Sequence, residues 1–138
     1  MPSAGYSKTP LAKKLGIKAG FNIKLINAPE YYFDLFTDMP EAINVSKDSE
    51  VKKDLIHLFT KSTAELNKIF PGLKKEIVPK GIIWVSWPKK SAKIITDVNE
   101  NIIRDTGLGC GLVDIKVCAI DEIWSGLKFV IPVKDRTS

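Results

Sequence analysis

The chain has 138 residues, of which 44% are hydrophobic, a size and composition typical of one soluble globular domain. No apolar run approaches the roughly 18 residues that span a bilayer, and the N-terminus lacks the apolar core of a signal peptide. We therefore expect a single cytoplasmic domain over residues 1–138 with no membrane contact. Two cysteines and one histidine cannot supply the four ligands of a structural zinc site, and neither a metal nor a cofactor is predicted.

The net charge of +5 comes from one part of the sequence. Residues 61–93 contain eight lysines and two glutamates, which gives +6, whereas the remaining 13 basic and 14 acidic residues give −1. Only 2 of the 21 basic residues are arginine, the residue preferred for bidentate recognition of phosphates and bases. The composition makes nucleic acid an unfavourable partner, and a solvated lysine-rich face is the simplest interpretation.

Residues 1–20 are predicted to form a helical arm. Thr9 is its candidate N-cap, and Gly16 suits a left-handed helix exit. Leu11 and Leu15 are four residues apart and share one face, so the arm should pack on the body of the domain.

The first strand is expected at residues 21–27, where apolar and polar side chains alternate. The turn from Asn27 to Glu30 follows it, and then a short aromatic-rich helix up to residue 36. In a dinucleotide or S-adenosylmethionine site this first turn would be rich in glycine, because backbone N–H groups must approach the ligand. No glycine occurs between Phe21 and Ser62, which argues against such a site.

A weak edge strand is expected at residues 43–45 and a clear strand at residues 54–59. We assign His57 in that strand a structural role, because no cysteine or carboxylate stands at ligand spacing. Ser62 and Glu65 form a capping box that opens a helix, which Pro71 and the glycine after it must divide in two.

Residues 81–90, with the sequence GIIWVSWPKK, predict a buried strand that ends in two lysines. A helix capped by Thr96 should follow and end at Gly107. The glycines of GLGCG at residues 107–111 have the spacing of a phosphate loop, but they leave a helix and enter a strand, the reverse of a phosphate loop. We interpret them as a helix exit and a tight turn.

The last elements predict an antiparallel hairpin of strands at residues 112–121 and 127–133, followed by a frayed tail at residues 134–138. The order of elements indicates an α/β fold: a single-domain, Rossmann-like, three-layer structure with a mostly parallel sheet and helices on both faces. Its C-terminal strand is expected to close the sheet as an antiparallel hairpin.

Two resemblances accompany this interpretation. Stretches at residues 9–18 (TPLAKKLGIK), 27–29 (NAP), 84–90 (WVSWPKK) and 124–128 (WSGLK) are similar to the hallmark stretches of a bacterial protein family of unknown function. That resemblance implies a cytosolic single-domain protein and brings no activity, substrate or catalytic residue with it. The closing hairpin also resembles that of Rossmann-like methyltransferases, which implies the spatial order weak strand, first, third, fourth, last, fifth.

In such a sheet the turns after the parallel strands meet at one edge, where ligands bind in open α/β proteins. The candidate ligand-binding residues at this edge are Asn27, Glu30, Ser62, Trp87, Lys89, Lys90, Asp121, Glu122 and Trp124. A helix N-terminus at Ser62 and the lysine ammonium groups suit an anion, and the indole rings could stack on a planar group.

Three functions are compatible with these residues. The first is a module that binds a small anionic or nucleotide-like ligand without catalysis. The second is a methyltransferase-like enzyme with an altered cofactor site, although a fold alone does not establish an activity. The third is a protein or nucleic-acid interaction module that uses the basic residues between Lys61 and Lys93. Against all three stands a purely structural interpretation, in which Trp87 and Trp124 belong to the core and the lysines are solvated.

Overall fold

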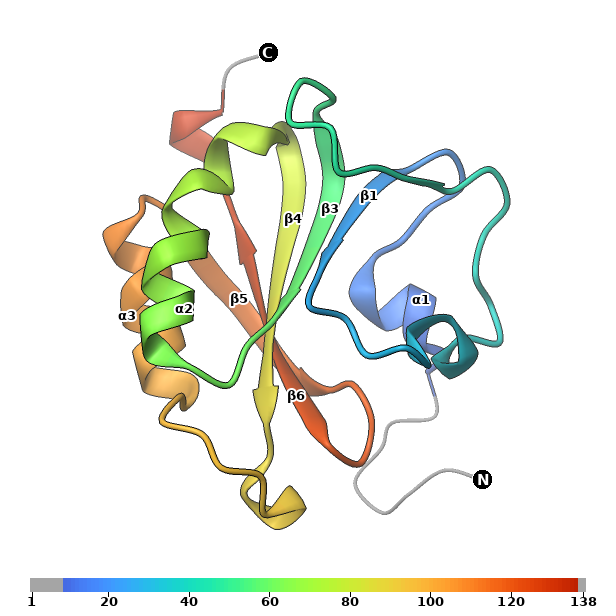
Figure 1. The fold of residues 1–138 in the computed structure, drawn as a ribbon. Helices are drawn as coiled ribbons and strands as arrows, with labels where there is room; N and C mark the ends of the chain where they lie inside the picture. Colours follow the sequence, from blue (N-terminus) through green and yellow to red (C-terminus); the bar gives the residue numbers. More distant parts are fainter. Residues whose placement is uncertain (1–8, 137–138) are drawn as a thin grey trace.

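The computed structural model describes residues 9–136, which form a six-stranded sheet between two helical layers (Figure 1). The strands are β1 (Asn22–Ile26), β2 (Asn44–Val45), β3 (Lys53–Phe59), β4 (Ile77–Pro88), β5 (Val113–Ala119) and β6 (Trp124–Val130). Their spatial order is β2-β1-β3-β4-β6-β5, with β1 to β4 parallel and β6 antiparallel to both of its neighbours. The predicted α/β class, the strand order and the antiparallel hairpin are confirmed.

The helices cover both faces of this sheet. On one face lie α1 (Leu11–Leu15) and a one-turn helix at Tyr32–Leu35, and on the other lie α2 (Thr63–Ile69) and α3 (Glu100–Gly109) (Figure 1). Further 3-10 turns occupy Phe70–Gly72, Lys74–Glu76, Lys90–Ala92 and Val133–Asp135. Each face has its own apolar core. The α1 core is centred on Leu15, Leu55 and Trp84, and the α2–α3 core includes Leu66, Ile103 and Phe129.

Two helices begin later than the sequence suggests, because the capping groups differ from those predicted. In α1 the N-cap is Pro10 rather than Thr9. The Asp38 carboxylate accepts hydrogen bonds of 3.0 and 3.1 Å from the backbone amides of Ala12 and Lys13. In α3 the cap is Asn99, whose Oδ1 accepts the Ile102 amide at 2.9 Å.

β4 begins four residues before the predicted start at residue 81. Pro79 and Gly81 lie inside the strand, where the pairing with β3 shifts register between Lys53 and Leu55. A bulge of this kind leaves residues unpaired, so it tolerates a proline without an N–H. At Gly81 a Cβ atom would lie 2.7 Å from the Cβ of Ile77, which explains the glycine.

The C-terminal part differs in two details. β6 begins at Trp124, three residues before the predicted start. The cause is a tight turn, in which Asp121 Oδ1 accepts hydrogen bonds from the backbone amides of Ile123 and Trp124. A one-turn helix at Val133–Asp135 replaces part of the expected frayed tail. Residues 137–138 of that tail and residues 1–8 of the N-terminal arm lie outside the described residues.

Gly107, which was expected to end its helix, lies within α3 where the helix crosses β6. A Cβ atom at this position would lie 2.1 Å from Cε1 of the fully buried Phe129, so the helix can pack this closely only without a side chain. The chain turns instead at Gly111, which has a φ of 83°.

This contact yields a stability prediction. Gly107→Ala should lower the free energy of unfolding by about 1–3 kcal/mol, because it overpacks the α3–β6 contact. Gly109→Ala is the matched control, since its Cβ would meet no atom within 4 Å. Alanine there should stabilise the helix relative to glycine by up to about 1 kcal/mol. Urea unfolding of both variants measures the difference. Equal stability of the two would show that the Phe129 contact does not constrain the helix.

Candidate functional site

The parallel strands end at one edge of the sheet, at the lower end of the molecule in Figure 1. Two pockets open at this carboxyl edge. The switch-point pocket, of about 340 Å³, is lined by Asn27, Ala28, Pro29, Phe59, Thr60, Lys61, Glu65 and Trp124. The β4-edge pocket, of about 890 Å³, is lined by Trp87, Pro88, Lys89, Lys90, Ile94, Thr96, Asp97, Val98, Asn99, Glu100, Asn101 and Ser125.

The position of the switch-point pocket follows from the topology. The chain crosses from β1 to β2 on one side and from β3 to β4 on the other, and ligands of open α/β sheets bind where the strand order reverses in this way. Asn27, the first residue after β1, has a φ of 58°. Asparagine tolerates this left-handed conformation better than most residues. The turn that a glycine-rich sequence would make is therefore made here by an asparagine.

The walls of the switch-point pocket combine an aromatic ring with two opposite charges. Trp124 is half-buried, and its ring meets the buried ring of Phe59 edge-on with the centroids 5.0 Å apart. Lys61 is exposed, whereas Glu65 is half-buried and accepts a hydrogen bond of 2.9 Å from the Thr60 hydroxyl. These groups can contact a planar ring, an anion and a hydrogen-bond donor.

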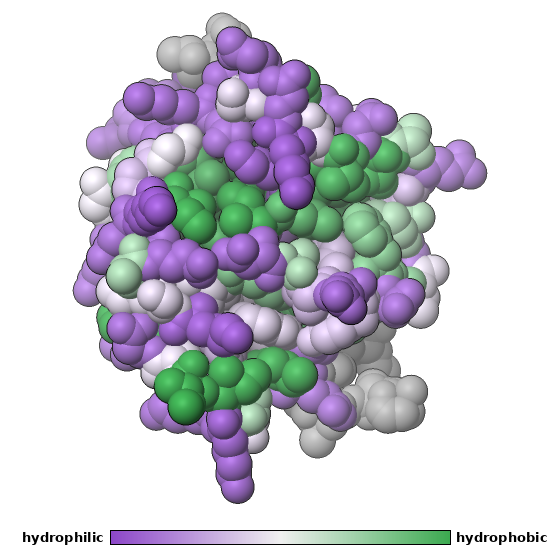
Figure 2. Space-filling model, in the orientation of Figure 1, coloured by the Kyte–Doolittle hydropathy of each residue, from purple (hydrophilic) through white to green (hydrophobic). Residues whose placement is uncertain are grey.

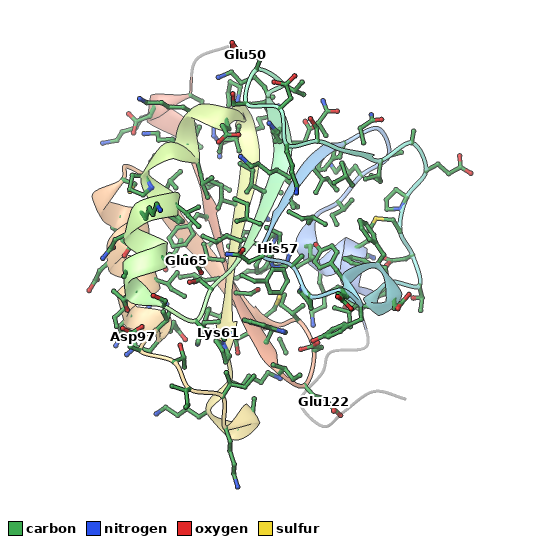
Figure 3. All side chains as sticks on the ribbon, viewed as in Figure 1. Glu50, His57, Lys61, Glu65, Asp97 and Glu122 are labelled. Carbon is green, nitrogen blue, oxygen red and sulfur yellow. The ribbon has the colours of Figure 1, made fainter. Side chains whose placement is uncertain are left out.

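The N-terminus of α2 does not have the anion-binding role expected for Ser62. Ser62 Oγ caps the helix by accepting the Glu65 amide at 3.2 Å. The Thr63 amide donates to Asp97 Oδ1 at 2.7 Å, so an internal carboxylate already occupies the place of an external anion. In Figure 3 Lys61, Glu65 and Asp97 surround this end of the helix. The helix is also short, and its seven residues give only a weak dipole.

The β4-edge pocket gathers the residues that follow β4. Trp87 is only 8% exposed and belongs to the α2–α3 core, so most of its indole ring is unavailable for stacking. Lys89 and Lys90 line the pocket, opposite the first turn of α3 with Asn99 and Glu100. Of the two tryptophans that were candidates for either core or site, Trp87 belongs chiefly to the core, and Trp124 lines a pocket.

Hydrogen bonds of Lys61 and Thr63 with Thr96 and Asp97 form a seam between the two pockets. Lys61, which lines the first pocket, accepts at its carbonyl oxygen a hydrogen bond of 2.7 Å from the Thr96 hydroxyl. Thr96 and Asp97 line the second pocket, and the Thr63 hydroxyl adds a bond of 3.1 Å to the carbonyl oxygen of Asp97. The pockets are therefore neighbours on one edge rather than two halves of one cavity.

The other predicted site residues lie outside both pockets. The carboxylate of Asp121 holds the turn before β6, as described above, and Glu122 and Glu30 are exposed. Glu122 lies at the tip of that turn, at the lower end of the molecule (Figure 3). The nine candidates therefore separate into Asn27 and Trp124 in one pocket, Trp87, Lys89 and Lys90 in the other, and four residues that line neither.

The basic segment at residues 61–93 does not form one patch, because it includes β4, which runs from the amino edge of the sheet to the carboxyl edge. Lys61, Lys89 and Lys90 line the two pockets of the carboxyl edge. Lys75 and Lys80 line pockets at the opposite edge, where the parallel strands begin. The lysines of residues 61–93 therefore do not share the single face that the sequence suggested.

His57 has the structural environment that was predicted for it. It is fully buried, with Nδ1 at 2.9 Å from the Tyr32 hydroxyl and Nε2 at 2.8 Å from the Ser86 hydroxyl. The Phe59 ring stacks on it with the centroids 4.2 Å apart. Burial lowers the pKa of His57 to about 3, so the ring is neutral at physiological pH. The network lies directly behind the Phe59 wall of the switch-point pocket.

Thr60, Glu65 and Asp97 at the carboxyl edge were not predicted as site residues. The capping-box spacing places Glu65 in the first helical turn after β3, a signal that could have identified it. Asp97 has no such signal, because its contact with Thr63 joins residues 34 positions apart. Among residues 9–136 no cluster of histidine, cysteine and carboxylate side chains could hold a metal ion, and no helix is long and apolar enough to cross a membrane.

The architecture is similar to that of solved methyltransferases. Precorrin-6y C5,15-methyltransferase from Geobacter metallireducens superposes with a TM-score of 0.58 at 6% identity, over 95% of this chain and 93% of the other. The fold is of the Rossmann-like methyltransferase type. Magnesium protoporphyrin IX methyltransferase from Synechocystis, solved with bound S-adenosylhomocysteine (SAH), gives 0.56 at 10% identity over 88% and 78%. Fibrillarin from Aeropyrum pernix, with bound S-adenosyl-L-methionine, gives 0.51 at 13% identity over 87% and 73%.

These identities are too low to carry an activity from one protein to another, so the likeness concerns the fold. No protein-family model and no curated protein matches the sequence. The resemblance of residues 84–90 and the other stretches to a bacterial family therefore stays a prediction.

Proposed function

We propose that this protein binds a small nucleoside-like ligand with an anionic group in the switch-point pocket. The observation that carries the proposal is the position of a pocket of about 340 Å³ at the topological switch point, with Trp124 and Lys61 among its lining residues. Its volume lies within the range of roughly 300–1,000 Å³ found for small-molecule sites.

Each wall has a role in this proposal. The indole of Trp124 contacts the face of the base, and Lys61 contacts the anionic group as a point charge. Glu65, positioned by the Thr60 hydroxyl, accepts hydrogen bonds from ligand hydroxyl or amino groups. Lys89 and Lys90 lie beyond the seam in the β4-edge pocket, where they can attract an anionic ligand toward the edge.

A second candidate function is methyl transfer from S-adenosylmethionine. It is favoured by the fold, since solved structures of this type hold S-adenosylmethionine or SAH. The turn after β1 argues against it, because Asn27 and Pro29 stand where a glycine-rich turn would bring N–H groups to the ligand. Proline has no N–H to offer.

Thermal unfolding in the presence of single ligands tests both candidates. The set comprises S-adenosylmethionine, SAH, adenosine nucleotides and sugar phosphates. A bound ligand at about 100 times its dissociation constant should stabilise the fold by about 2.7 kcal/mol. We expect a nucleotide to give this shift, and both Trp124→Ala and Lys61→Gln to reduce it. Lys68→Gln is the matched control, since Lys68 is exposed on α2 and lines neither pocket.

The outcomes separate the alternatives. A shift with S-adenosylmethionine or SAH alone favours the methyltransferase candidate over the binding module. A nucleotide shift that survives in Trp124→Ala and disappears in Lys89→Ala/Lys90→Ala would place the ligand in the β4-edge pocket instead. No shift with any of these ligands contradicts both candidates.

A further inference from the structure

The amino edge of the sheet, opposite the proposed ligand site, carries a second concentration of basic side chains. Two pockets of about 530 and 400 Å³ lie on the two sides of Val78 and Pro79, which line both of them. We call the two pockets together the amino-edge groove. Six basic side chains line it, namely Lys18, Lys52, Lys74, Lys75, Lys80 and Arg136.

These side chains come together only in the folded protein. They belong to the segment after α1, the starts of β3 and β4, the turn at Lys74–Glu76 and the C-terminal region. Hydrophilic side chains gather at the corresponding upper end of the molecule in Figure 2. The Nζ atom of Lys52 donates to the carbonyl oxygen of Lys75, and Arg136 Nε donates to the carbonyl oxygen of Ile131 at 2.9 Å. Both basic groups are thus fixed against the rim of the groove.

The acidic residues near the groove do not neutralise it. Two carboxylates line it, of which Asp54 accepts the Asn22 amide at 2.8 Å and Asp135 is exposed. Glu76 pairs with Lys24 at 2.9 Å and with Lys53 at 3.4 Å. Glu50 lies in the loop at the upper end (Figure 3) but lines neither pocket. The lining therefore carries an excess of positive charge.

Both pockets of the groove also have apolar lining residues. Phe21 and Ile82 line one of them, Ile77 and Ile131 line the other, and the Val78–Pro79 segment lies between them. Recognition of a phosphate backbone favours arginine, whereas five of the six basic residues here are lysines. A lining that combines lysines with apolar side chains instead complements a chain that carries both carboxylates and apolar side chains.

We propose that the amino-edge groove binds an acidic peptide segment of a partner protein. Its apolar side chains contact Val78 and Pro79, which line both pockets, and its carboxylates meet the lysines of the lining. Charge complementarity at a rim chiefly raises the association rate and makes binding sensitive to salt. This site is independent of the ligand proposed for the carboxyl edge.

Fluorescence anisotropy with a labelled peptide of glutamate and leucine tests the proposal on the full chain. We expect saturable binding that weakens as the ionic strength rises. Lys52→Gln/Lys74→Gln/Lys75→Gln should weaken it about tenfold, the effect of losing several rim ion pairs. The matched control, Lys13→Gln/Lys47→Gln/Lys68→Gln, removes the same charge from exposed positions outside the groove and should bind as the unchanged protein does.

Three results would overturn the proposal. The first is equal binding of a peptide in which glutamine replaces glutamate, since the rim charges would then play no part. The second is equal loss of binding in the groove variant and the control variant, which would indicate a non-specific charge effect. The third is displacement of the peptide by a single-stranded oligonucleotide at lower concentration than by unlabelled peptide, which would assign the groove to nucleic acid.

Discussion

Replacing Trp84 with alanine should lower the free energy of unfolding by about 3–5 kcal/mol, as truncation of a buried tryptophan generally does. Trp84 lies at the centre of the α1 core and is fully buried in the middle of β4. Its ring packs in the same cluster as Leu11 and Leu15 of the arm, and its Nε1 donates to the carbonyl oxygen of Leu15 at 2.9 Å. The substitution therefore removes the main packing and a long-range hydrogen bond together.

Trp84→Phe separates these two contributions. It retains an aromatic ring but leaves the buried carbonyl oxygen of Leu15 without its donor, which should cost about 1–3 kcal/mol. Urea unfolding measures both variants, and limited proteolysis reports whether α1 detaches first. A loss below about 1 kcal/mol in Trp84→Ala would mean that the arm is not held to the sheet by this residue.

The second large effect is a dependence of stability on pH that comes from His57. Burial lowers its pKa to about 3 in the folded protein, whereas an exposed histidine in the unfolded chain titrates near 6.5. Between these values the unfolded state binds a proton that the folded state does not bind. Stability should therefore be constant above pH 6.5 and fall by about 1.4 kcal/mol for each pH unit below it, until the folded pKa is reached.

Urea unfolding between pH 7 and pH 5 measures this slope, and His57 is the only histidine of the sequence. Over that interval the loss should amount to about 2 kcal/mol. His57→Gln keeps a polar group next to Tyr32 and Ser86 but cannot titrate, so its stability should vary much less with pH even if its absolute value is lower. An identical pH dependence in both proteins would show that His57 is not held neutral by the fold. Asp114, whose pKa Arg104 lowers by hydrogen bonding, contributes only at lower pH.

Much of the architecture follows from local sequence signals. An apolar run located β3, an apolar run between Gly81 and Pro88 located β4, and the Ser62–Glu65 spacing located the start of α2. These signals work because backbone preferences and side-chain periodicity act over a few residues. The strand order came from the resemblance to methyltransferases and is confirmed by the structure. The predicted starts of α1 and α3 were wrong, since a carboxylate 25 residues away binds the first turn of α1 and Asn99 caps α3 in place of Thr96.

The candidate site was less predictable than the fold. Asn27 and Trp124 were correctly expected at one edge, because the ends of parallel strands converge there. That they share a pocket with Thr60, Lys61 and Glu65, while Trp87 turns into the core, depends on packing between distant segments. The occupation of the α2 N-terminus by Asp97 likewise depends on a contact between separate parts of the chain.

The sequence by itself therefore determined the elements, their order and the residues that end at each turn, because short-range physics decides these. The tertiary structure alone decided which charges share a surface. β4 places Lys89 and Lys90 at one edge of the sheet and Lys80 at the other, although all three belong to one basic segment. An extended strand places residues that are close in sequence at opposite edges of the sheet. Residues as distant in sequence as Lys18 and Arg136 line the same groove.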